Sequence, residues 1–207
     1  PQTAFAGLQK SLQHEWQFIQ RVIDDIGDCF FELEDAITNI FLPALYGESL
    51  KDCTYRRKLS ALPVKFAGLA IPDPTASSEE NFEASTLVCS HLLAAFRGTE
   101  AFSSTDHKAV RTAVGAELKS RRTVKLDSAL ETILGELDCD TRRTILRGKE
   151  TGQWLSVMPS TLNGTELSAQ EFRDALLLRH ARTPGNLPPH CDGCGTKFDV
   201  RHALGCK

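Results

Sequence analysis

The stretch Leu62-Pro-Val-Lys-Phe-Ala-Gly-Leu-Ala-Ile-Pro-Asp-Pro74 is apolar, but its three prolines and its glycine prevent it from forming a regular helix. We expect an ordered, partly buried loop that packs on the helices before it. On both sides of this loop, apolar residues recur at spacings of three and four, which is the pattern of amphipathic helices. No stretch alternates as a strand does. The sequence therefore predicts an all-α fold built from helical bundles.

Two amphipathic helices are expected before the loop, over residues 3–26 and from about residue 28 to Gly47. Their apolar stripes are Phe5, Leu8, Leu12, Trp16, Ile19, Ile23 and Ile26 in the first and Leu33, Ile37, Ile40, Phe41 and Leu45 in the second. A short helix over about residues 50–61 carries the basic run Arg56-Arg57-Lys58. We expect both long helices and the loop to share one core, made of Trp16, Ile19, Phe41, Leu45, Phe66 and Leu69.

Further helices are indicated after the loop. One begins at Ser77, which forms a capping-box pattern with Glu80, and ends near Gly98. A more highly charged helical pattern covers residues 106–146. A second capping box, Ser168-Ala-Gln-Glu171, predicts the start of a last helix, which ends near residue 181.

The segment Cys191-Asp-Gly-Cys194-Gly-Thr-Lys-Phe-Asp-Val-Arg-His202-Ala-Leu-Gly-Cys206 supplies three cysteines and one histidine within sixteen residues. Zinc takes four such ligands tetrahedrally, and a Cys-x-x-Cys turn presents two sulfurs to one ion. Four protein ligands leave no position open for water, so the expected zinc site is structural rather than catalytic. Two alternatives remain open. The cysteines can be ordinary buried thiols, and His190 is a rival ligand, although its adjacency to Cys191 makes joint binding awkward.

A polar connector at residues 99–105 divides the helical part of the chain. The prolines that precede the Cys-x-x-Cys turn separate the metal-binding end from the last helix. The expected domains are therefore two helical subdomains and a zinc knuckle, over residues 1–98, 99–181 and 182–207.

Charge is distributed unevenly along the chain. Residues 1–104 carry 8 Lys/Arg and 14 Asp/Glu, a net −6, whereas residues 105–207 carry 16 and 13, a net +3. A polyanionic partner should therefore meet the second half. Basic clusters on the expected helices are either a phosphate-facing patch or a solvated surface. The candidate phosphate contacts are Arg121, Arg122, Arg142, Arg143 and Lys197.

The remaining cysteines bear on the compartment. Cys29, Cys53, Cys89 and Cys139 are scattered without the spacing of a disulfide framework. Free thiols together with a zinc site indicate a reducing, intracellular compartment, either cytoplasm or nucleus. No apolar run approaches the roughly 20 residues needed to span a bilayer, and the first residues do not form a signal peptide, so no membrane partner is expected. The missing initiator Met suggests a piece of a longer protein.

Three parts of the sequence together resemble the reverse transcriptases of non-LTR retrotransposons. The stretch 62–74 resembles the LP-x-R-x-GGLGI-x-(N/D)P segment that follows the polymerase core, with Ala67 and Ala70 in place of glycines. Leu33-Glu-Asp-Ala-Ile37 with Phe41-Leu-Pro-Ala-Leu45 resembles the helix upstream of that segment. Trp154-Leu, Pro159 and Leu167-Ser-x-x-Glu-Phe-Arg-Asp-Ala-Leu-Leu-Leu-Arg179, followed by the Cys-Cys-His-Cys segment, resemble the region that leads to the C-terminal zinc knuckle. Its C-x₂-C-x₇-H-x₃-C spacing is longer than that of retroviral nucleocapsid knuckles, which argues against base reading of the nucleocapsid kind.

The resemblance implies a thumb-and-connection region, with residues 1–98 thumb-like, that holds RNA or an RNA–DNA duplex beside a polymerase core upstream in the parent chain. The catalytic aspartates would precede Pro1, and no aromatic-x-Asp-Asp sequence occurs here. In such elements an endonuclease can follow the knuckle. The expected function is therefore binding of template–primer or element RNA without catalysis. The alternative is a structural or protein-interaction zinc module that binds no nucleic acid.

Overall fold

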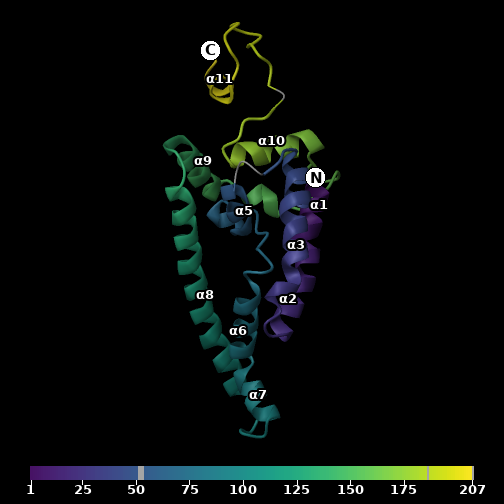
Figure 1. The fold of residues 1–207 in the computed structure, drawn as a ribbon, viewed down its shortest axis with the longest axis vertical. Helices are drawn as coiled ribbons and strands as arrows, with labels where there is room; N and C mark the ends of the chain where they lie inside the picture. The colour runs from purple at the N-terminus through teal and green to yellow at the C-terminus, as the bar shows by residue number, and fades with distance from the viewer. Residues whose placement is uncertain (51–53, 186, 207) are drawn as a thin grey trace.

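A computed structural model describes residues 1–50, 54–185 and 187–206, and these ranges are helical (Figure 1). They contain no β-strand, and the only β-type pairing in them is an isolated antiparallel bridge between His190 and Lys197. The all-α prediction is confirmed. The α-helices in these ranges are α1 (Gln2–Gly7), α2 (Gln13–Val22), α3 (Phe31–Ala36), α4 (Leu42–Tyr46), α5 (Thr54–Ala61), α6 (Ser78–Val88), α7 (Ser90–Phe96), α8 (Ser104–Gly135), α9 (Cys139–Glu150), α10 (Ala169–Arg179) and α11 (Val200–Gly205).

The first expected helix is interrupted by a π-helical turn over Leu8–Leu12 and ends at Val22 instead of residue 26. A π turn holds one extra residue and therefore rotates everything after it relative to a continuous α-helix. The predicted stripe is consequently wrong at Leu12, Ile19 and Ile23, whereas Ile26 does pack against the first hydrophobic cluster. Its first members and Trp16 are buried, but Leu12, Ile19 and Ile23 are 58%, 40% and 50% exposed.

Glutamines occupy the inward positions that the π turn creates. Gln9, Gln13 and Gln20 are buried. The Gln9 side-chain amide donates to the carbonyl of Leu69 at 3.1 Å, and that of Gln20 donates to the carbonyl of Pro74 at 2.6 Å. The helix thereby satisfies backbone acceptors of a buried segment that has no regular hydrogen-bond ladder.

The segment 62–74 is the buried loop that its composition predicts, and we call it the central loop. Its backbone turns sharply, because Ala67 and Ala70 adopt φ values of +67° and +56°. Between them, Gly68 has no room for a side chain, since a Cβ there would lie 1.9 Å from the carbonyl oxygen of Leu62. The two alanines therefore sit in the left-handed region that glycine adopts most readily.

The central loop contributes to two hydrophobic clusters. Leu69 and Ile71 pack in the first cluster with Trp16, Leu42 and Leu45, and Phe41 lies partly buried against it. Phe66 packs in the second cluster, whose other members include Leu59, Leu130, Ile133, Leu134 and Ile145. The expectation that Phe66 and Ile19 join the core of Trp16 is therefore wrong. The loop lies between the two clusters, because Leu62, Phe66 and Ala67 pack in the second cluster and Leu69 and Ile71 in the first.

Two predicted capping boxes have different outcomes. Ser168 and Glu171 form the full reciprocal box at the start of α10. Ser77 makes no side-chain cap at the start of α6. The Asp73 carboxylate takes that role one turn earlier, because its Oδ1 accepts from the backbone N–H groups of Thr75 and Ala76.

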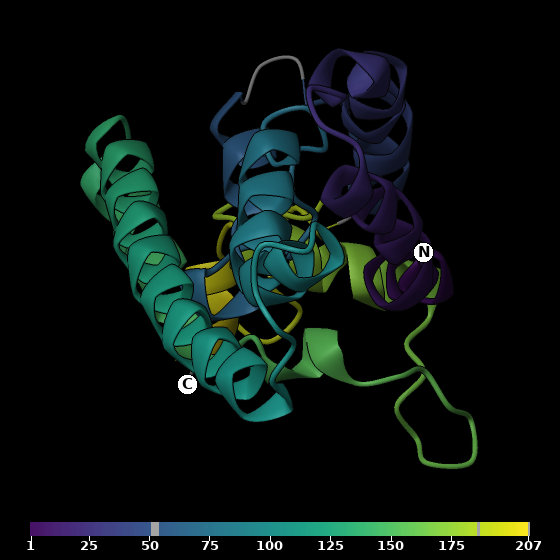
Figure 2. The same cartoon turned by 90° about the horizontal axis from the view of Figure 1, so that it is seen from below.

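The helices α6 and α7 run antiparallel to α8 and form an arm with it (Figure 1). The helix α6 also packs against α2, and the arm projects past the N-terminal helices at α7. Residues 97–103 make the turn at the tip of this arm. Viewed along the long axis, α6 stands between α8 and the N-terminal helices (Figure 2). The C-terminal segment with α11 lies at the opposite end of the molecule, beyond α10 (Figure 1).

Candidate metal centre and basic residues

A tight backbone turn presents the first two metal-ligand candidates. The N–H of Gly195 donates to the carbonyl of Cys191, and the N–H of Cys191 donates to the carbonyl of Thr196, both at 2.8 Å. Gly195 has a φ of +70°, which suits glycine. The turn thereby aims the side chains of Cys191 and Cys194 toward the same point.

The helix α11 supplies the other two candidates. Asp199 caps it, because its carboxylate accepts from the backbone N–H of His202 at 2.7 Å. His202 lies on this helix and Cys206 directly follows its last residue, so one helical turn separates the two ligands. The N–H of Cys206 donates to the carbonyl of His202 at 2.8 Å, which keeps Cys206 in register at the helix end.

These four side chains converge. Cys191 Sγ lies 3.7 Å from Cys206 Sγ, and Cys194 Sγ lies 3.2 Å from His202 Nε2. All four ligand atoms lie within 4.8 Å of one another. Two thiolates at about 2.3 Å from a tetrahedral zinc ion are about 3.8 Å apart, so the spacing and the Cys₃His set fit a zinc site. The group can bind a metal ion.

The surroundings of the three thiols shift their pKa values in different directions. Hydrogen bonds from the backbone N–H groups of Cys194 and Gly193 lower the pKa of the Cys191 thiol. Hydrogen bonds from Thr196 lower the pKa of Cys194. The sulfurs of Cys191 and Cys194 raise the pKa of Cys206 to about 11. Without a cation the third thiolate is therefore disfavoured, and a divalent ion would remove that repulsion.

His190 and the other cysteines that the structure describes lie outside this group. His190 pairs with Lys197 in the β-bridge and is not among the convergent ligands found in the described ranges. Cys29 and Cys139 are exposed free thiols, and Cys89 is a half-buried one. Cys53 lies outside the described residues.

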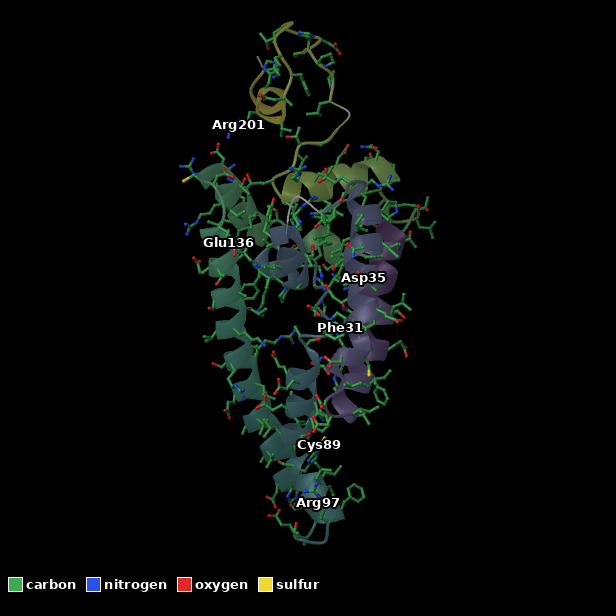
Figure 3. All side chains as sticks on the ribbon, in the orientation of Figure 1. Phe31, Asp35, Cys89, Arg97, Glu136 and Arg201 are labelled. Carbon is green, nitrogen blue, oxygen red and sulfur yellow. The ribbon has the colours of Figure 1, made fainter. Side chains whose placement is uncertain are left out.

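An ion pair links the metal-binding end to the helical body. Arg201 Nη2 lies 2.7 Å from Asp140 Oδ2 at the start of α9, and Figure 3 labels Arg201 at the side of the C-terminal segment that faces that helix. Both side chains are largely exposed, so the pair orients the segment rather than adding much stability.

Most of the predicted phosphate contacts are engaged with acidic side chains. Arg121 lies 3.3 Å from Glu83, Arg142 lies 3.8 Å from Glu131, and Arg143 lies 3.7 Å from Asp140. Lys197 is exposed on the turn that carries the metal ligands. Arg122 makes no ion pair in the described part of the chain and lines a cleft beside α8. The structure therefore does not gather the five predicted residues into one surface.

The basic run of α5 has a structural role that its composition did not indicate. Arg56 is fully buried and pairs with Glu48 at 2.6 Å. Arg57 makes two 2.6 Å hydrogen bonds to the carboxylate of Glu34 and donates to the carbonyl of Ile71 at 2.9 Å. These side chains fix α5 to its neighbours and to the central loop.

A buried polar cluster at the end of α10 was also missed from sequence. His180 contacts the Tyr46 hydroxyl through Nδ1 and the carbonyl of Ala67 through Nε2. Arg179 donates to the carbonyls of Gly148 at 2.6 Å and Val64 at 3.0 Å. Burial lowers the pKa of His180 to about 3 and raises the pKa of Tyr46. These partners are far apart in sequence, so no local spacing could have indicated them.

Comparison with known proteins identifies no relative: no family model matches the chain, and no curated protein or solved structure is found to be similar to it. No described helix is long and apolar enough to cross a membrane.

Proposed function

We propose that this chain is a non-catalytic nucleic-acid-binding region of a retroelement reverse transcriptase, closed at its C-terminal end by a structural zinc ion. Its task would be to hold template–primer or element RNA beside a polymerase core elsewhere in the parent protein. Its compartment would be reducing, because thiolate ligands must stay reduced to bind zinc.

The observation that carries this proposal is the backbone of the central loop. Ala67 and Ala70 have positive φ values, and these are the two positions at which the resembling family segment has glycine but this chain does not. Glycine is the residue expected wherever a loop must adopt such angles. The positive φ values at both positions fit the glycines of the family segment and thereby support the resemblance.

The zinc assignment rests on chemistry rather than on the fold. Cysteine thiolates and imidazole suit Zn²⁺, and four protein ligands leave no position for a reacting water. Cys191, Cys194, His202 and Cys206 would therefore hold the ion and fix the fold of the C-terminal segment. The metal would have no part in catalysis.

A salt-dependent binding assay tests the proposed function. The zinc-loaded chain should bind structured RNA and an RNA–DNA duplex at low salt with little sequence preference. The logarithm of the affinity should fall linearly with the logarithm of salt concentration, because phosphate contacts release counterions. Absence of binding at low salt would contradict the proposal.

A second function, a structural or protein-interaction zinc module, is favoured by two features. The ion pairs of Arg121, Arg142 and Arg143 leave these residues poorly available to phosphate. Apolar side chains are also exposed on the N-terminal helices, with Phe18 67% and Phe31 60% exposed; Phe31 is labelled in Figure 3. If the chain binds no nucleic acid in that assay, the structural or protein-interaction function remains.

A further inference from the structure

The structure has a cationic cleft between α8 and the central loop, which we call the α8 cleft. It encloses about 430 Å³, and its charged lining residues are Lys65 from the central loop and Lys119 and Arg122 from α8. No acidic residue lines it within the described part of the chain. Its floor is apolar or uncharged, with Pro63, Leu126 and Gln17 among the residues that line it.

The three cations of the α8 cleft are available to a ligand. None of them makes an ion pair with another described residue, and all three are exposed. Lys65 Nζ lies 5.1 Å from the centre of the Phe66 ring, which positions the amine without neutralising it. By contrast, Lys125 one turn further along α8 is engaged by Glu80.

The periodicity of α8 explains why the adjacent Arg121 and Arg122 have different surroundings. Lys119 and Arg122 are three residues apart and therefore lie on one face of the helix. Arg121 is turned by about 100° from Arg122 and reaches Glu83 on α6. The hollow on that side is lined by Glu79, Glu80 and Glu83 as well as by Lys119, Arg121, Arg122 and Lys125. Its acidic residues offset most of its positive charge, so it suits a polyanion less well than the α8 cleft does.

The cationic region continues into a neighbouring hollow of about 520 Å³, which shares Gln17, Pro63 and Arg122 with the α8 cleft. Arg21, on its rim, also has no ion-pair partner among the described residues. Asp73 and Glu80 lie in this second hollow, so the surplus of positive charge is greatest in the α8 cleft itself. A ligand that carries several negative charges in a row would follow the cations from one hollow to the next.

We infer that the α8 cleft binds the sugar–phosphate backbone of a single-stranded nucleic acid through Lys65, Lys119 and Arg122. This inference rests on the proposed function and assigns a surface to it. A concave cleft with two walls admits one strand, whereas a duplex would contact only its rims. No aromatic side chain lines the α8 cleft in the described ranges, so bases cannot stack there, and binding depends on phosphate contacts with little sequence preference.

The test measures fluorescence anisotropy of a labelled oligouridylate of about 16 nucleotides, titrated with the zinc-loaded chain at several salt concentrations. The groove variant carries Lys65→Glu, Lys119→Glu and Arg122→Glu. The matched control carries Lys10→Glu, Lys108→Glu and Arg111→Glu, which make the same charge change at exposed residues outside the cleft. A charge-preserving variant, with Lys65→Arg, Lys119→Arg and Arg122→Lys, separates loss of charge from misfolding.

The groove variant should bind at least about tenfold more weakly, and its slope of log affinity against log salt should fall by about 2, which corresponds to three lost contacts to a single strand. The matched control should lose much less, and the charge-preserving variant should bind nearly as the unmodified chain does. Equal weakening of binding in the groove variant and the control would overturn the assignment of binding to the α8 cleft while leaving the proposed function intact. Tighter binding of the same strand in a duplex, or binding of the duplex alone, would overturn the single-strand assignment. Absence of binding to both the single strand and the duplex would overturn the proposed function as well.

Discussion

The hydroxyl of Tyr46 and Nδ1 of His180 lie 2.5 Å apart inside the protein, although 134 residues separate them in sequence. Ser60 also contacts the Tyr46 hydroxyl, at 3.1 Å, and His180 Nε2 contacts the Ala67 carbonyl at 3.2 Å. This contact ties the end of α10 to α4 and to the central loop. It also connects the segment just before the metal ligands to the N-terminal helices.

The first prediction concerns acid stability. Burial holds the pKa of His180 at about 3, below its ordinary 6.5, so the unfolded chain binds more protons than the folded chain between these values. The free energy of unfolding is therefore highest above pH 6.5, where His180 is neutral in both states. It falls as the pH drops from 6.5 toward 3, by up to about 1.4 kcal/mol per pH unit. Urea unfolding followed by tryptophan fluorescence at pH 7.5 and pH 5.5 measures this. A His180→Gln variant should be less stable at pH 7.5 but should lose less on acidification; an equal loss in both proteins would refute the assignment.

The second prediction concerns the metal. The purified chain should contain about one zinc per molecule, and Cys194→Ser should remove it, because a four-ligand site loses much of its affinity with one ligand. Chelator should unfold residues from about 183 onward while leaving the signal of the helical body. Cys139→Ser removes an exposed thiol that is not part of the group and should retain the metal. Well-folded protein without metal in elemental analysis would contradict this prediction.

The third prediction compares two neighbouring positions of the central loop. Gly68→Ala should destabilise the protein by about 3 kcal/mol or more, because the new Cβ would lie 1.9 Å from the carbonyl oxygen of Leu62. Ala70→Gly should stabilise it by up to about 1 kcal/mol, because it removes a left-handed residue with a Cβ. Chemical denaturation of both variants measures the two changes, and a shift of the same sign in both would show that the loop does not hold these backbone angles.

The fourth prediction compares two phenylalanines. Phe66 is 5% exposed and packs in the cluster of Leu130 and Ile145, so Phe66→Ala should cost roughly 3–5 kcal/mol. Phe18 is 67% exposed, so Phe18→Ala should change stability by less than about 0.5 kcal/mol. Thermal unfolding of the two variants gives the comparison, which fails if Phe66→Ala melts like the unmodified protein.

The fifth prediction separates two adjacent arginines on α8. Arg122→Glu should weaken nucleic-acid binding across all sequences, because the side chain lines the α8 cleft and phosphate contacts carry no base information. Arg121→Glu should weaken it less, since Arg121 is already engaged by Glu83. Anisotropy titrations at one low salt concentration measure both. If Arg121→Glu has the larger effect, the binding surface lies on the α6 side of the helix.

Local patterns predicted the features that depend on residues close in sequence. The capping box of Ser168 and Glu171 forms as expected, and the four ligand candidates from Cys191 to Cys206 converge because only sixteen residues contain them. The central loop was recognised from its prolines and apolar residues. In each case the sequence signal lies within about sixteen consecutive residues, although distant residues such as Gln9 and Gln20 also hold the central loop in place.

Features that depend on distant partners were not predicted. The sequence shows Arg56 and Arg57 only as part of a basic run, whereas Glu48 and Glu34 hold them in buried or half-buried ion pairs. Lys65 was not recognised as a partner of Arg122, because the α8 cleft exists only when the central loop packs beside α8. Such sites require tertiary contacts that a single sequence does not specify by spacing.

The π-helical turn at Leu8–Leu12 has a consequence for how this chain tolerates changes in length. The turn accommodates one more residue than an α-helix would, and each residue of a helix rotates the following part by about 100°. Deleting a single residue there would convert the turn into ordinary α-helix and would leave Gln20 facing the Pro74 carbonyl, because the turn already absorbs that residue. The same deletion in the middle of α8, which has no such turn, would rotate the rest of that helix by about 100°. The chain should therefore tolerate the loss of one residue at Leu8–Leu12 better than within its longest helix.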